Sequence, residues 1–182
     1  MKVFCIGFNK TGTVSLSTAL RKLGFPGIHG LWENHIKVKR ALNENKKLLH
    51  YFSSRICHFS DLDIIKDNFE ILDTQYPNSK FILNTRNKED WIKSRTHHFN
   101  DYQKHLVLGT KKYKKTWKWV TYSQDEWVSQ WDDHHSKVLA YFKDRRDFTV
   151  FNIPHGDGYK KLCKFLHVPF LNKPFPKKNI TR

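Results

Sequence analysis

A loop near the N-terminus combines residue types that bind anions. Residues 7–15 read Gly-Phe-Asn-Lys-Thr-Gly-Thr-Val-Ser, follow a short apolar run and precede a helical pattern. Backbone N–H groups of such a loop, together with the N-terminus of the next helix, form an anion cradle. Gly7 and Gly12 have the spacing of a Walker A motif, but Thr13 stands where that motif requires Lys, and Lys10 lies inside the loop instead. The pattern therefore predicts an anion site that differs from that of nucleotide hydrolases.

An arginine follows the clearest of the later strands. Residues 80–85 predict a buried strand, and Arg86 comes directly after it. A nucleotide kinase or ATPase needs Mg²⁺, which an Asp at the end of a second strand usually holds. Because Arg binds an anion and repels a metal, the pattern favours transfer of an anionic group without a metal. A sulfuryl group fits, since it carries less charge than a phosphoryl group and needs less neutralisation.

The charge balance also indicates anionic partners. The chain has 33 Lys and Arg against 17 Asp and Glu, a net charge of +16. Such a surface suits nucleic acid, phosphorylated cofactors, and sulfated or acidic substrates. We expect no signal peptide, because the apolar run at residues 3–6 is too short for one, and no apolar run approaches the roughly 18 residues that a membrane-spanning helix needs. We therefore expect a soluble cytoplasmic protein without a membrane span.

Strand and helix patterns alternate along the chain. Such alternation is typical of an α/β domain with a P-loop-like, three-layer architecture, in which helices flank a central, largely parallel sheet and ligands bind at the carboxyl ends of its strands. We expect a single domain over residues 1–182, with residues 97–123 as its least regular part. The expected strands are residues 2–6, 55–59, 80–85 and 148–153, and the expected helices are residues 13–23, 34–50, 62–75, 124–143 and 159–166.

Three elements together resemble the sulfotransferases that use 3′-phosphoadenosine 5′-phosphosulfate (PAPS). Lys10-Thr11-Gly12-Thr13, with Ser15 and Leu16 following, resembles their 5′-phosphosulfate loop. Arg86 at a strand end, with Ser94 eight residues later, resembles their site for the 3′-phosphate. Residues 156–163, Gly-Asp-Gly-Tyr-Lys-Lys-Leu-Cys, then Pro-Phe-Pro at 174–176 and Asn179, resemble the C-terminus of one branch, with Tyr159 replacing its Trp.

The resemblance implies a metal-independent transfer of the sulfuryl group of PAPS, with adenosine 3′,5′-bisphosphate as the product. It implies that Lys10 stabilises negative charge on the leaving phosphate, as the family's loop lysine does. The residues implied to bind the cofactor are Lys10, Thr11, Gly12, Thr13, Val14 and Ser15 in the loop, and Arg86 and Ser94 beyond the later strand.

The acceptor needs a general base, and two residues qualify. In the branch that this chain resembles, an Asp within a D-x-P element lies between the loop and the Arg strand. Asp61 aligns with it, although the Pro is missing, and we place Asp61 first. His58 is the alternative, because the ordinary pKa of His is better matched to the task.

The sequence does not identify the acceptor. We expect a hydroxyl or amine compound, with anionic compounds, carbohydrates, small alcohols and protein tyrosine among the options, and no stable nucleic-acid partner. One alternative function is a basic nucleic-acid-binding protein, which the net charge and the basic, aromatic run of residues 111–119 favour. A nucleotide or polyol kinase is a third option, disfavoured by the displaced Lys10 and the missing metal ligand.

Overall fold

A computed structural model describes residues 1–107 and 121–178 of the chain. The basic run at 111–119 and Asn179 lie outside the described residues. The chain divides into two compact units. Among the described residues, the first unit holds residues 1–85 and 144–178, and the second holds the remainder of residues 86–143.

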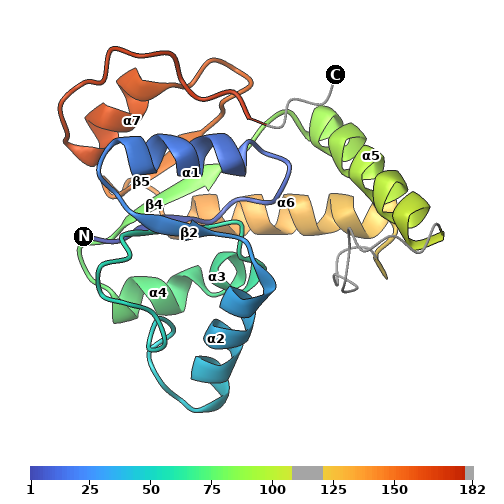
Figure 1. Ribbon diagram of the computed structural model, residues 1–182, viewed down its shortest axis with the longest axis horizontal. Helices are drawn as coiled ribbons and strands as arrows, with labels where there is room; N and C mark the ends of the chain where they lie inside the picture. Colours follow the sequence, from blue (N-terminus) through green and yellow to red (C-terminus); the bar gives the residue numbers. More distant parts are fainter. Residues whose placement is uncertain (108–120, 179–182) are drawn as a thin grey trace. The chain divides into compact units, whose positions relative to one another are not determined.

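A five-stranded, wholly parallel sheet forms the centre of the first unit, with the strand order β2-β3-β1-β4-β5 (Figure 1). This confirms the expected α/β class. The expectation missed β2, which is only three residues long and begins at a glycine. A side chain at Gly27 would overlap the ring of His58, so only glycine lets β2 lie this close to β3. The strands are β1 (Val3–Cys5), β2 (Gly27–His29), β3 (His58–Ser60), β4 (Lys80–Asn84) and β5 (Phe148–Phe151).

Helices cover both faces of this sheet, which gives the three layers (Figure 1). Alternate residues of a strand point to opposite faces, so β1 contributes Val3 and Cys5 to one core and Phe4 to the other. The first core lies under α1 (Thr13–Lys22) and α7 (Tyr159–Leu166). The second is aromatic, with Phe4 packed against Phe59 and Phe81. The helices on that face are α2 (Trp32–Asn43), α3 (Asp63–Asp67) and α4 (Phe69–Gln75).

Two expected helices differ from the observed ones. The helix expected over residues 34–50 ends at Asn43. The helix expected over residues 62–75 is interrupted at Asn68, which ends α3 and begins α4. The Asn68 side chain donates a hydrogen bond to the carbonyl of Ile64 (2.7 Å), and Asn competes in this way with the regular helical hydrogen bonds.

The second unit contains α5 (Lys88–Val107) and α6 (Gln124–Tyr141). Asn87 accepts a hydrogen bond from the backbone of Asp90, and a capping box begins α6. The rings of Trp91 and Trp131 pack at 4.4 Å between centroids. Because α5 continues to Val107, residues 97–107 of the region expected to be irregular are helical. In residues 1–107 and 121–178, no helix is long and apolar enough to cross a membrane.

Candidate active site

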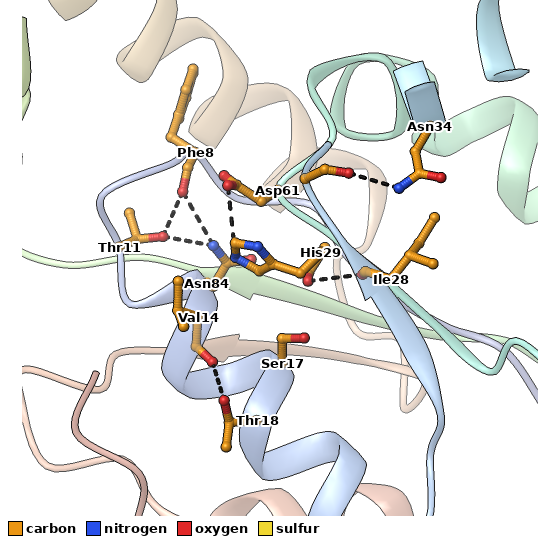
Figure 2. A network of polar contacts seen from close by, with 12 residues as sticks. Phe8, Thr11, Val14, Ser17, Thr18, Ile28, His29, Asn34, Asp61 and Asn84 are labelled. Atoms are coloured by element: carbon orange, nitrogen blue, oxygen red, sulfur yellow. Dashed lines mark hydrogen bonds and ion pairs between the residues drawn. The ribbon is translucent and has the colours of Figure 1, made fainter. Parts of the chain in front are cut away.

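The loop between β1 and α1 is held in place by β4. Asn84, at the end of β4, accepts a hydrogen bond from the backbone N–H of Gly7 (3.0 Å). Its amide nitrogen donates to the carbonyl of Phe8 (3.3 Å) and to the hydroxyl of Thr11 (2.6 Å), as Figure 2 shows. A Cβ on Gly7 would overlap the Asn84 carbonyl oxygen, so this close approach requires glycine. The loop therefore has its shape fixed by a strand 77 residues away in sequence.

The side chain of Thr11 faces the interior of the loop. It is fully buried, and its hydroxyl donates to the Phe8 carbonyl (2.6 Å) while it accepts from Asn84. Its hydroxyl thus supports the loop, which leaves the backbone and the neighbouring residues to face a ligand.

The end of the loop is shaped for an anion. Lys10 and Gly12 both have positive φ, 65° and 85°, which turns the chain sharply into α1. The first turn of α1, all of which the structure describes, carries no acidic side chain. A helix N-terminus presents unpaired N–H groups and a partial positive charge, so this turn favours negative charge. Thr13 and Ser15 are buried in that turn, and the Ser15 hydroxyl accepts a hydrogen bond from the backbone of Lys178 (3.0 Å).

Asp61 and His29 lie together where β3 and β2 end. His29 pairs with Ser60 across the two strands, so Asp61 follows directly beyond that pair. The Nε2 atom of His29 lies 3.7 Å from Oδ2 of Asp61 (Figure 2). The carboxyl ends of parallel strands meet at one edge of a sheet, and the anion loop follows β1 at that same edge.

The electrostatic environment of Asp61 makes its carboxylate more basic than an ordinary one. Burial raises the pKa of Asp61 to about 6, and the neighbouring carboxylate of Asp63 adds to that rise. His35 and Lys10 act in the opposite direction on the same pKa. A carboxyl group whose pKa lies near 6 is a better base than an ordinary, fully hydrated one.

His58 occupies a different environment from Asp61. Its ring is fully buried, with Nε2 2.8 Å from the Ser17 hydroxyl and Nδ1 2.8 Å from the Phe25 carbonyl. Burial lowers the pKa of His58 to about 4. Both ring nitrogens are thus engaged with the first unit's own groups.

Arg86 and Ser94 both belong to the second unit. Arg86 lies two residues before α5, and Ser94 lies on α5 between Trp91 and Arg95. Arg95 itself is buried, with its guanidinium 4.8 Å from the ring centroid of Trp91. Arg86 and Ser94 are each half-buried.

The family of the chain follows from a comparison with models of known protein families. The model of the family described as "Sulfotransferase domain" matches residues 2–182. The chain belongs to this sulfotransferase family. Its match runs through both compact units. A search of the curated proteins finds no match to this sulfotransferase.

The structure of this sulfotransferase brings two further residues, Asn84 and His29, to the site. From the sequence, Asn84 was predicted only as part of a buried strand. A polar side chain at the end of such a strand was the one feature that could have indicated a role at the site. His29 lies in the short strand β2, which the apolar pattern did not predict. The glycines on either side of residues 28–29 were the only local sign of a special backbone there.

Proposed function

We propose that this sulfotransferase transfers the sulfuryl group of PAPS to a hydroxyl or amine acceptor without a metal ion. The observation that carries the proposal is the loop after β1, which brings Lys10 and the N-terminus of α1 to the carboxyl edge of the sheet. We further propose that residues 1–182 act as one domain, which the extent of the family match supports.

The donor groups of the loop suit the 5′-phosphosulfate end of the cofactor. Lys10 supplies positive charge, and the N-terminus of α1 supplies backbone N–H groups. The residues that provide this N-terminus are Gly12, Thr13, Val14 and Ser15. Thr11 contributes through its backbone, because its hydroxyl is engaged within the loop. For the 3′-phosphate we propose Arg86 and Ser94, on the family spacing of eight residues. The bound cofactor supplies the sulfuryl group.

The protein's own residues then have two tasks in the transfer. Lys10 stabilises the negative charge that grows on the leaving phosphate oxygen, which lowers the barrier if the charge is larger in the transition state than in the ground state. Asp61 removes the proton of the acceptor. The pKa of Asp61, about 6, supports this assignment over His58, whose ring nitrogens already have partners in the interior.

The acceptor in this proposal is an anionic compound or a carbohydrate that carries a hydroxyl group. The net charge of +16 supports an anionic acceptor, because it attracts such compounds to the protein. The same charge supports the second candidate, a nucleic-acid-binding protein, which would bind random DNA with a strong dependence on salt.

The test uses the full chain with a chelator present. Adenosine 3′,5′-bisphosphate should raise the melting temperature more than AMP does, because only the former fills a 3′-phosphate site. Arg86→Ala should remove this difference, and Arg146→Ala, which changes an exposed arginine, should retain it. Equal shifts with the two nucleotides would contradict the proposed cofactor. DNA binding that adenosine 3′,5′-bisphosphate does not displace would favour the second candidate.

A further inference from the structure

The ends of β2 and β3 are built around the pair of His29 and Asp61. Beyond the His29–Ser60 register pair, the backbone N–H of Gly30 donates to the carbonyl of Ser60 (3.0 Å). The Asn34 side chain donates to the carbonyl of Gly30 (2.9 Å), which ties this turn to α2. A Cβ on Gly30 would lie 3.5 Å from Oδ2 of Asp61, so the turn packs directly against the carboxylate.

The ring of His29 has a buried nitrogen aimed at this carboxylate. Nε2 is buried and has no hydrogen-bond partner among the residues that the structure describes. Its distance to Oδ2 of Asp61, 3.7 Å, is longer than a hydrogen bond, but a small rotation of either side chain would close it. A buried polar atom without a partner is uncommon in a folded protein and calls for an explanation, of which a catalytic role is one.

The charges around the pair favour a neutral ring facing a carboxyl group. Burial lowers the pKa of His29, Arg21 lowers it further, and a hydrogen bond with the backbone of residue 29 raises it. The groups that act on Asp61 are Lys10 from the loop, His35 from α2 and Asp63 from α3. A neutral imidazole whose Nε2 carries a lone pair can accept a hydrogen bond from a protonated carboxyl group but not donate one to a carboxylate.

We propose that His29 is a positioning residue for the proton acceptor: its Nε2 accepts a hydrogen bond from Asp61 once Asp61 has taken the proton of the acceptor. This inference rests on the proposed function. In that step the acceptor O–H bond breaks and its proton moves to Oδ2 of Asp61. The acceptor oxygen forms a bond to sulfur, and the bond from sulfur to the 5′-phosphate oxygen breaks, leaving its electron pair on the phosphate.

The pairing predicts a specific effect on the rate of transfer. When Asp61 gains the proton, the hydrogen bond to His29 stabilises the protonated carboxyl and so makes Asp61 a stronger base. We expect His29→Phe, which keeps a ring of similar shape, to lower kcat about 2- to 10-fold, the effect of one hydrogen bond. His29→Gln restores an acceptor atom and should recover most of that loss, with the KM for PAPS unchanged in both variants.

The decisive measurement is the ¹⁵N chemical shift of His29 across a pH titration of the full chain without cofactor. We expect Nε2 to be unprotonated above about pH 8 and to shift as Asp61 gains its proton near pH 6. Asp61→Asn should abolish that inflection. The exposed His155 in the same spectra is the control, and its ¹⁵N signals should be the same in both proteins.

Two results would overturn the inference. One is an Nε2 that carries a proton at high pH, or an inflection that persists in Asp61→Asn. The other is a His29→Phe variant with wild-type kcat. Because the spectra require no substrate, they test the pair even if the protein transfers no sulfuryl group, and absence of transfer by the wild type would count against the proposed function alone.

Discussion

Replacement of Asn84 by Ala should loosen the anion loop and destabilise the first unit. The Asn84 side chain is fully buried and joins β4 to Gly7, Phe8 and Thr11 through three hydrogen bonds of 3.0, 3.3 and 2.6 Å. Asn84→Ala removes all three and leaves the buried N–H of Gly7 without its acceptor. The Phe8 carbonyl still receives the hydroxyl of Thr11 (2.6 Å), so part of the loop's bonding survives.

The expected loss of stability follows from these contacts. A buried donor left without a partner costs about 1–3 kcal/mol, and a hydrogen bond contributes about 0.5–1.5 kcal/mol net. We therefore expect the free energy of unfolding to fall by about 2–4 kcal/mol, a large share of the 5–15 kcal/mol that is typical of a domain. Asn84→Asp keeps an acceptor for Gly7 but turns an oxygen toward the Phe8 carbonyl, so it should be destabilised as well at neutral pH.

Urea denaturation followed by tryptophan fluorescence measures this change. Asn87→Ala is the matched control, because Asn87 is exposed and its side chain accepts a hydrogen bond from the backbone N–H of Asp90 at the start of α5. The control should lose about 1 kcal/mol, as is typical for a helix cap. If the proposed function is correct, Asn84→Ala also weakens binding of adenosine 3′,5′-bisphosphate, while Asn87→Ala leaves it unchanged. A loss below about 1 kcal/mol for Asn84→Ala would refute the view that this residue fixes the loop.

The other predictions concern charges and the transfer itself. Because the folded protein raises the pKa of Asp61 to about 6, the ionised carboxylate destabilises the fold; Asp61→Asn should melt higher than wild type above about pH 6 and equally below about pH 4. Burial lowers the pKa of His58 to about 4, so the neutral His58 ring stabilises the fold fully above the unfolded pKa of about 6.5, and this contribution is lost as the pH falls toward 4. The free energy of unfolding of His58→Gln should therefore depend less on pH than that of the wild type between about pH 6.5 and 4. Arg145 pairs with Asp73 (2.8 Å) and lowers the pKa of Asp147, so Arg145→Met should lose about 1–2 kcal/mol in urea at pH 7 and less below about pH 4. Lys10→Ala should lower turnover about 10²- to 10³-fold in a PAPS assay while nucleotide affinity stays close to wild type; near-normal turnover would rule out its role.

Much of the architecture could be predicted from local patterns. The apolar run of residues 80–85 predicted β4, which spans Lys80–Asn84, and the helix expected over residues 159–166 is α7. These elements were predictable because their apolar residues lie close in sequence and repeat with the period of a strand or a helix. The misses, β2 and the break at Asn68, are short features in which one glycine or one polar side chain outweighs the apolar pattern.

The sequence by itself also identified the family. The loop around Lys10, the spacing of Arg86 and Ser94, and the C-terminal run of residues 156–163 resemble the PAPS-dependent sulfotransferases, and the family match over residues 2–182 confirms membership of a sulfotransferase family. These features could be recognised in the sequence because each is a run of a few residues, or a fixed spacing along one strand and the helix after it. The roles of the individual residues stay predictions.

Contacts between residues that are far apart in the sequence depend on the tertiary fold. Asn84 meets Gly7 because β4 pairs with β1, and His29 meets Asp61 because β2 pairs with β3 in register. No local pattern encodes these contacts, since they depend on strand order, on parallel register and on glycines that allow close approach. The same holds for Asp61 and His58, three residues apart in sequence. Asp61 lies just beyond the end of β3, and His58 lies in the core, where burial and two hydrogen bonds hold its ring.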